Sequence, residues 1–497
     1  MLGAVPRDEK VVDFEVWAPA ASSLVVRVNG DEHTLVRGED GFWRGEAPAR
    51  HGDDYVFVLD GVDLPDPASR WQPDGVRGPS RVLDTAQFDL EPVRPALEDL
   101  VLYELHVGTF TAEGTFDGAI RHLGALAELG VTAVEVMPIA TFPGTRGWGY
   151  DGLYTSAPHE AYGGPEAFAR FVEAAHDEGL GVVLDVVYNH VGPGNETLRA
   201  FGPYFTDRHE TFWGDALDYS ERAVREWAIQ NAELWVRDYG VDGLRLDAVH
   251  AVFDDSPQHV LAELAERVRA IAPRTLVTDE METGDLRPIE DWGHDAQWAD
   301  ELHHELHALL TEEREGYYAG YGSLEGLAAQ LRREPAERLI VCSQNHDQVG
   351  NRAVGDRPAV DELRLRAAVL LFAPQTPLLF MGEEYGERRP FQFFTDHIDP
   401  AIAEATREGR RREFAGFAGF SGEEVPDPQA RSTFEASKLD RWRPDEELRA
   451  FYRELLDLRR ELPREIDVEV DGSRLRARRG NVELHVDFDA KTVEVRR

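Results

Sequence analysis

The spacing of apolar residues differs between two parts of the chain. Residues 11 to 60 alternate apolar and polar positions in short runs, with Gly, Pro and Asn between them. A period of two is typical of strands with one buried face, and short runs joined by turn residues predict a small β-sandwich. A connector rich in Pro, Asp and Gly follows over residues 64 to 80, so we expect the sandwich domain to occupy residues 1 to 85.

After this connector, strand-like and helix-like segments alternate. Amphipathic stretches separate the strand candidates and several end in Gly, as helices commonly do. Eight such β-then-α units predict an α/β fold, a (β/α)8 TIM barrel over residues 86 to 400. The sixth strand candidate is the shortest, and it is included partly because a TIM barrel has eight strands. The strand candidates span residues 100–110, 131–139, 181–190, 241–250, 274–280, 295–298, 338–347 and 376–386.

Two further segments depart from the repeat. Residues 191–220 are rich in Gly, Pro and aromatic residues and are too long for an ordinary loop, so we expect a small excursion over the barrel mouth. Residues 401–497 begin with a charged helical pattern and end in short alternating runs. This order predicts a helical segment followed by a reduced C-terminal β domain.

The charge of the chain limits its partners. The formal net charge is -41, and only three of the 53 basic residues are lysines. Nucleic acid and anionic membranes are therefore poor partners, and we interpret the charge as adaptation of a halophilic protein to a saline cytoplasm. No apolar run approaches the roughly 20 residues of a membrane span, and residues 1–10 lack a signal-peptide core, so we expect cytoplasmic residence. The single cysteine, Cys342, excludes an internal disulfide.

Polar residues gather where the predicted strands end. In a TIM barrel the active site lies at the C-terminal ends of the strands. One acidic strand end is ordinary in so acidic a protein, but four ends that mix Asp, His and Arg predict a shared site. The residues are Asp185, Asn189 and His190; Arg245, Asp247 and His250; Asp279 and Glu280; and His346 and Asp347.

These strand ends resemble the four signature regions of the α-amylase superfamily of glycoside hydrolases. The matching segments are "DVVYNH", "GLRLDAVH", a Glu after the fifth strand, and "QNHD". Within the superfamily, "GYDGLYTSAPHEAYGGPEA", "LLFMGEEYGERRPFQFFTDH" and "STFEASKLDRW" are similar to malto-oligosyltrehalose trehalohydrolases. The resemblance implies hydrolysis of the α-1,4 bond next to the terminal trehalose unit of malto-oligosyltrehalose, and a malto-oligosyltrehalose synthase as functional partner.

The chemistry of a retaining glycosidase agrees with this resemblance. Such an enzyme needs a carboxylate nucleophile and a carboxylic acid on either side of the bond that breaks. Asp247 lies two residues after Arg245 on the same strand face, and the cation would keep the nucleophile ionised. Asp347 would stabilise the oxocarbenium-like transition state, with His346 and His190 as hydrogen-bond donors.

The acid must be chosen between two neighbours. Successive strand residues face opposite sides, so Asp279 and Glu280 cannot both face the mouth. The family pattern E-x-D-x-x-D-x-R matches "EMETGDLR" when Glu280 is the acid, whereas a register that starts at Asp279 loses the later matches. We therefore predict Glu280 as acid/base, with a raised pKa.

The remaining predictions concern substrate contacts. Tyr150 in "WGYDG" resembles the superfamily tyrosine that packs under the sugar at the cleavage site, and the same resemblance extends the binding set to Arg245 and His250. Asp151, Trp213, the aromatic segment 390–394 and Glu384 are further candidates for sugar contacts. We expect no cofactor and no metal: Asn189 resembles a calcium ligand of ordinary amylases, but no oxygen-rich loop accompanies it.

Two alternatives remain open. One is a glycogen-branching or debranching enzyme of the same superfamily, and the other is a catalytically inactive amylase-like binding protein. All three carboxylates are present, which disfavours the inactive protein. The sequence does not indicate an oligomeric state.

Overall fold

A computed structural model describes the chain except for residues 89, 212, 283, 415–424 and 442. Its centre is a closed barrel of eight parallel strands, hydrogen-bonded in chain order, with the last strand paired to the first. The predicted TIM barrel is confirmed, including its short sixth strand. The strands are β10 (Leu102–Leu105), β11 (Ala133–Val136), β14 (Gly181–Val186), β17 (Gly243–Leu246), β18 (Leu276–Asp279), β19 (Ala296–Trp298), β20 (Leu339–Cys342) and β21 (Thr376–Phe380).

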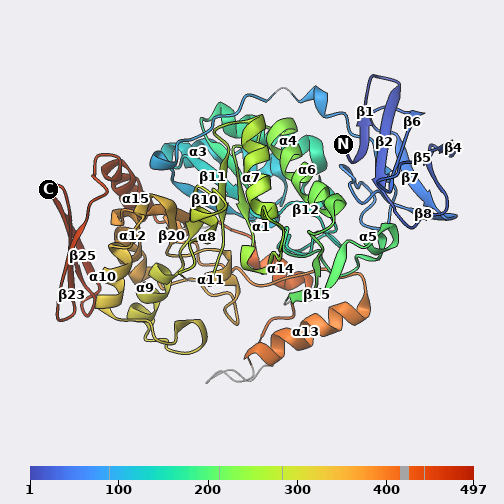
Figure 1. Cartoon of the computed structure of the whole chain (residues 1–497). Coiled ribbons are helices and arrows are strands. Elements are labelled where there is room, and N and C mark those ends of the chain that lie inside the picture. The colour runs from blue at the N-terminus through green and yellow to red at the C-terminus, as the bar shows by residue number, and fades with distance from the viewer. Residues whose placement is uncertain (89, 212, 283, 415–424, 442) are drawn as a thin grey trace.

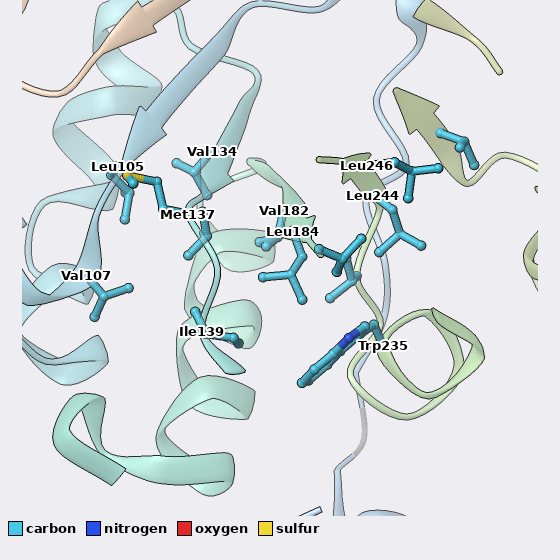
Figure 2. Close-up of a cluster of buried hydrophobic side chains, with 14 of the residues drawn as sticks. Leu105, Val107, Val134, Met137, Ile139, Val182, Leu184, Trp235, Leu244 and Leu246 are labelled. Atoms are coloured by element: carbon cyan, nitrogen blue, oxygen red, sulfur yellow. The ribbon is translucent and has the colours of Figure 1, made fainter. Parts of the chain in front are cut away.

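Both faces of the barrel strands are buried, which explains their nearly continuous apolar sequences. On β11, Val134 and Val136 belong to the large core shared with the surrounding helices, whereas Ala133 belongs to a separate cluster inside the barrel. Figure 2 shows the outer set, with Val134, Val182 and Leu244 on neighbouring strands. Alternation along each strand therefore decides which side chains point inward.

Helices surround the barrel where amphipathic stretches were predicted. Gly130, with a φ of 109°, ends α3 (Leu123–Leu129) in the left-handed conformation that favours glycine. The other helices beside the barrel include α4 (Gly164–Asp177), α6 (Arg222–Asp238), α7 (Val260–Ile271), α9 (Glu301–Thr311), α10 (Leu324–Leu331) and α12 (Leu363–Phe372). Among the described residues, no helix has both the length and the hydropathy needed to cross a membrane.

Antiparallel sheets lie near the two ends of the chain, on opposite sides of the barrel in Figure 1. The N-terminal part contacts α6: Leu2 N donates to Gln230 (2.8 Å), and Trp227 Nε1 donates to the Pro67 carbonyl (3.1 Å). One N-terminal sheet contains β1 (Gly3–Pro6), β2 (Val11–Trp17), β5 (Val36–Arg37) and β6 (Phe42–Pro48). The other contains β3 (Leu24–Val28), β4 (Asp31–Thr34), β7 (Asp54–Leu59), β8 (Val62–Leu64) and β9 (Ser80–Arg81).

The C-terminal sheet follows the helices α13 (Pro400–Phe414), α14 (Arg431–Ser437) and α15 (Glu446–Arg459). Its buried Arg479 donates to the carbonyls of Phe372 (3.0 Å) and Ala373 (3.2 Å), so the sheet docks on the end of α12. Its strands are β22 (Asp467–Asp471), β23 (Arg474–Arg479), β24 (Val482–Asp487) and β25 (Thr492–Arg496). Part of the predicted helical segment, residues 415–424, lies outside the described residues.

The segment after β14 contains α5 (Glu196–Phe201) and a hairpin of β15 (Phe205–Thr211) and β16 (Gly214–Leu217). It also contacts the N-terminal part of the chain, because the rings of Tyr204 and Trp17 pack edge to face with centroids 5.1 Å apart. The predicted excursion over the mouth thus corresponds to a helix and a two-stranded ribbon.

Several predicted strands are too long at their C-terminal ends. Residues after β10 and β20 turn into the short helices α1 (Val107–Phe110) and α11 (His346–Gly350). At α11 the Asn345 side chain caps the helix by accepting from Gln348 N (2.7 Å). Capping favours a helical turn over continued strand, and this turn carries His346 and Asp347.

Candidate active site

Arg245 lies at the centre of the polar residues inside the barrel mouth. Its guanidinium is fully buried and donates from Nη1 to Asp185 (2.8 Å) and to Asp247 Oδ1 (2.9 Å). Its Nη2 donates to Glu280 Oε2 at 2.6 Å. The ring of Trp298 covers the guanidinium carbon at 4.3 Å from the ring centroid. One planar cation therefore holds two of the predicted catalytic carboxyl groups, from strands β17 and β18, side by side.

Exposure increases from Arg245 toward the mouth. The side chain of Asp247 is 10% exposed, that of Glu280 27% and that of Asp347 29%. The predicted carboxyl groups thus face the open end of the barrel above a buried cation. Burial destabilises an ionised carboxylate, and the contacts of Arg245 with Asp247 and Glu280 counteract part of that cost.

Glu280 carries the pKa shift that a general acid needs. Enclosure of its carboxyl group raises the pKa to about 8; Arg245 opposes the shift, and Asp247, Asp347 and Asp300 add to it. Glu280 also accepts from Ala248 N at 3.3 Å. Near neutral pH the group is protonated, as a proton donor to a leaving oxygen must be.

Asp279 points to the other side of β18, as strand geometry requires. It is fully buried and its Oδ2 lies 2.8 Å from His294 Nδ1. This separation agrees with the predicted choice of Glu280 over Asp279.

Tyr150 and His346 form a second part of the site. Tyr150 Oη donates to Asp185 Oδ2 (2.7 Å) and lies 2.8 Å from His346 Nε2, while the two rings stack with centroids 5.2 Å apart. Burial would lower the pKa of His346, but Asp347 and Glu104 outweigh it and raise the pKa to about 10. His346 is therefore a cation, with Asp347 Oδ2 3.4 Å from its Nε2.

Asn189, His190 and Trp213 connect the loop after β14 to the site. Asn189 Nδ2 donates to Asp247 Oδ2 at 2.7 Å, and its Oδ1 contacts His190 Nδ1. The Trp213 ring stacks on His190 with centroids 4.6 Å apart and remains 46% exposed. An exposed indole next to the site offers an apolar face of the kind on which sugar rings stack.

The backbone is strained directly after Asp247. Ala248 has a φ of 41°, in the left-handed region that residues with a Cβ rarely adopt. Strain of this kind persists where surrounding contacts hold it, and here Ala248 N donates to Glu280. The turn therefore connects the two predicted catalytic groups through the main chain as well as through Arg245.

The structure does not bring every predicted binding residue into this network. Glu384 is buried and accepts from Tyr103 Oη at 3.2 Å with each oxygen, so its carboxylate is engaged away from Arg245. His250 is exposed on η4 (Val249–Ala251) and has no hydrogen bond to the other candidates within the described part of the chain. Asp151 lies beside Tyr150 in sequence, and its Oδ2 is 3.7 Å from His397 Nε2.

The aromatic segment 390–394 lies largely in the hydrophobic core rather than at the surface of the site. Phe391 and Phe394 are fully buried, and Phe391 stacks on Trp148 with centroids 5.2 Å apart. These two rings therefore belong to the core and offer no exposed face to a sugar. Pro390, Gln392 and Phe393 are partly exposed.

Sequence reasoning missed several polar residues near the site. Glu104 on β10 accepts from His346 N at 2.8 Å and contacts its ring nitrogen. Asp300, after β19, accepts from Gln348 Nε2 at 3.1 Å, and its pKa is raised to about 6 by burial and by Asp347. Each follows a barrel strand or faces inward from one, so the strand-end rule could have found them.

The described residues contain no candidate metal cluster that competes with this arrangement. Across the described ranges of the chain, no three His, Cys, Asp or Glu side chains are grouped to hold an ion. Asn189 uses its amide on Asp247.

Comparison with known proteins adds the family. The α-amylase catalytic-domain family matches residues 104–213. The malto-oligosyltrehalose trehalohydrolase of Deinococcus radiodurans is 45% identical, over 90% of this chain and 81% of the relative. That of Saccharolobus solfataricus is 42% identical, over 91% and 86% of the two chains. The chain belongs to the malto-oligosyltrehalose trehalohydrolase family.

Solved structures share the fold of this chain. The crystal structure of an α-amylase candidate from Salmonella typhimurium shares 37% identity at a TM-score of 0.90, covering 98% of this chain and 93% of that one. Pullulanases share the fold at a TM-score of 0.75 and 18% identity. A branching enzyme of Photobacterium profundum is 31% identical over only 50% of this chain and 40% of its own length. The trehalohydrolase relatives alone among these curated enzymes match most of the chain.

Proposed function

We propose that this protein is a retaining glycoside hydrolase that cleaves the α-1,4 bond next to the terminal trehalose unit of malto-oligosyltrehalose. The products are free trehalose and a malto-oligosaccharide. The observation that carries the proposal is the bridge from Arg245 to Asp247 and Glu280 at the mouth of an amylase-type barrel, in a chain whose full-length relatives bear the trehalohydrolase name.

In the first half of the reaction, Asp247 attacks the anomeric carbon of the sugar. Glu280 gives its proton to the glycosidic oxygen, so the C–O bond to trehalose breaks and trehalose leaves as the neutral alcohol. Arg245 and Asn189 hold the carboxyl group of Asp247 in a fixed orientation. The product of this step is a glycosyl ester on Asp247.

In the second half, the ionised Glu280 removes a proton from water, and the oxygen of that water replaces Asp247 at the anomeric carbon. Asp347 and the His346 cation lie beside the reacting sugar in this proposal. A carboxylate stabilises the positive charge that develops at the anomeric carbon, and the imidazolium donates to hydroxyl groups. Tyr150 would support the apolar face of the same sugar.

The substrate implies a position in a reaction sequence. An enzyme that rearranges the reducing end of a malto-oligosaccharide into a trehalose unit must supply it, which fits a malto-oligosyltrehalose synthase as functional partner. The charge of -41 supports a working environment of high salt, such as a saline cytoplasm, where repulsion among surface carboxylates is screened.

The decisive experiment compares products from malto-oligosyltrehalose, maltopentaose and glycogen in molar salt. We expect free trehalose from the first substrate, and turnover of maltopentaose lower by about 10²-fold or more, because a linear end leaves buried polar groups unpaired. Rapid attack on maltopentaose, or new branches on glycogen without trehalose release, would assign the protein to the branching and debranching enzymes. Early product observed by proton NMR should be the α anomer, since two displacements retain configuration. A β anomer first would exclude Asp247 as nucleophile.

A further inference from the structure

Glu135 is an acid inside the barrel that the proposed mechanism does not use. It lies on β11 between the outward Val134 and Val136 and is 1% exposed. Neither carboxyl oxygen has a hydrogen-bond partner among the described residues. An isolated carboxyl group buried in this way costs several kcal/mol in general, so its surroundings require explanation.

Strand register places Glu135 inside the barrel, just below the site. Glu135 is paired with Glu104 on β10 and with Val183 on β14, whereas Asp185 is paired with Arg245 on β17, so Asp185 and Arg245 lie two residues nearer the C-terminal ends of their strands. Glu104, Glu135 and Asp185 each lie two positions after an inward apolar residue, and Arg245 lies two positions after Gly243, where a Cβ would meet the inward Leu276 and Val183. Side chains two apart on a strand share a face, so the four residues form one polar layer, two residues deep, on four neighbouring strands above the apolar interior.

Other polar atoms in or beside this layer also lack a protein partner among the described residues. They are Asp185 Oδ1, Arg245 Nε and Trp298 Nε1, all in side chains at least nine-tenths buried. Two are donors and the carboxyl oxygens are acceptors. Water both donates and accepts and typically makes about three hydrogen bonds when buried, so it fits this mixture, whereas a cation would be repelled by the N–H groups.

The charges that face Glu135 favour its neutral form. Burial is the largest influence and raises its pKa well above the usual range, and Glu104 and Asp185 raise it further. Arg245 and His346 act in the opposite direction without reversing the shift. A neutral carboxylic acid can donate one hydrogen bond and accept others, whereas a carboxylate can only accept.

We propose that Glu135 is a positioning residue that, as a neutral carboxylic acid, holds internal water against Arg245 Nε and Asp185 Oδ1. Arg245 uses both of its terminal nitrogens on carboxyl groups of the site, so water at Nε completes its hydrogen bonds and fixes the plane of the guanidinium. Glu135 thereby orients Asp247 and Glu280 without touching substrate. The inference rests on the proposed roles of these two residues.

Two measurements test the proposal without any substrate, so they stand even if the proposed function fails. A high-resolution crystal structure should contain a water oxygen within hydrogen-bond distance of both Glu135 and Arg245 Nε. The infrared difference spectrum between wild type and Glu135→Gln should contain the C=O band of a protonated carboxylic acid. Absence of the water, or a carboxylate band in place of the acid band, would overturn the proposal.

Variants test the positioning role by kinetics. Glu135→Gln keeps a neutral hydrogen-bonding group, so kcat should fall by only about two- to five-fold and the alkaline limb of the pH profile should stay in place. An ionised Glu135 would instead make this variant lower the alkaline limb by roughly one pH unit, because a negative charge near Glu280 would be lost.

Glu135→Leu expels the water and leaves Arg245 Nε unpaired, so kcat should fall by about 10- to 100-fold with KM changed by less than about three-fold. The matched control is Ile340→Val in the apolar layer below, which should lower Tm and leave the pH profile unchanged. Equal kcat values for Glu135→Leu and Glu135→Gln would refute the positioning role. If the Leu variant does not fold, the crystal structure and infrared band decide.

Discussion

The protein pairs an arginine with carboxyl groups in two opposite environments. Arg245, fully buried, contacts Asp185, Asp247 and Glu280, while Arg476 in the C-terminal sheet contacts Glu469 and Glu483 and is 46% exposed. Hydrogen bonding to Arg476 is the main reason that the pKa of Glu483 falls to about 2. The pKa of Glu280 rises to about 8 in spite of Arg245.

The comparison shows that burial, rather than the pairing of an arginine with a carboxyl group, determines the direction in which the pKa of the carboxyl group shifts. Water stabilises both charges at Arg476, so the ion pair adds little and simply favours ionisation. Inside the barrel, desolvation and the nearby Asp247 and Asp347 outweigh one cation. Exposed ion pairs of this kind therefore do not produce a general acid, whereas one buried arginine can orient the predicted acid and nucleophile.

The largest expected effect comes from removing the predicted acid, Glu280. Glu280→Gln should lower kcat by roughly 10⁴-fold with KM largely kept, because the leaving oxygen loses its proton donor. Asp279→Asn is the matched control, since it changes the neighbouring carboxyl on the opposite face and should remain measurably active. Steady-state kinetics on malto-oligosyltrehalose distinguish the two, and reversed phenotypes would show that the acid is Asp279.

The buried cation is the next target. Arg245→Lys keeps the charge but cannot reach Asp247 and Glu280 with a planar fork, so kcat should fall by about 10²- to 10³-fold. Because Arg245 lowers the pKa of Glu280, a less well placed cation should move the alkaline limb to higher pH. The pH dependence of kcat/KM measures this shift. An unchanged limb would mean that Arg245 does not set the state of Glu280.

The pH profile of the wild type gives a third prediction. Glu280 must be protonated to act as the acid, so kcat/KM should be maintained up to about pH 8 and fall about ten-fold per unit above it. The sign follows from a raised pKa, since the active form is lost as pH rises through that value. An alkaline limb below about pH 6 would contradict the enclosed position of the carboxyl group.

A higher salt concentration should affect the charged surface and the buried site differently. An increase from about 0.1 M to about 2 M NaCl should raise Tm by several degrees, because it screens repulsion within a surface of net charge -41. The alkaline limb should move by less than about 0.3 pH units, since buried pairs are screened much less. Thermal melts and pH profiles at both concentrations provide the comparison. A Tm that falls with salt would refute the interpretation of the charge.

The smallest effect belongs to the exposed arginine. Arg476→Gln should leave kcat unchanged and change Tm by no more than about 2 °C at low salt, because exposed ion pairs contribute little. The measurement is differential scanning calorimetry beside Arg245→Lys. A large loss of stability would show that the C-terminal sheet depends on its surface pairs.

The sequence alone predicted most of the barrel strands, because strands buried on both faces are largely apolar and the helices between them have apolar residues at a period of 3.6; the short sixth strand was placed partly by the count of eight. Alternation along a strand also predicted that only one of Asp279 and Glu280 faces the mouth, and the family resemblance indicated Glu280. The order of the motifs pointed to the family that the relatives at 42% and 45% identity share.

Which polar side chains contact one another depends on the tertiary structure. Glu104, Glu135, Asp185 and Arg245 are far apart in the chain, and strand register alone places them in one layer. Glu384 and Phe391 looked equally suited to binding a sugar, yet packing buries both away from the Arg245 network. Composition along a chain specifies what a segment can bury, whereas the pKa of Glu280 depends on the desolvation and charges that several distant segments create together.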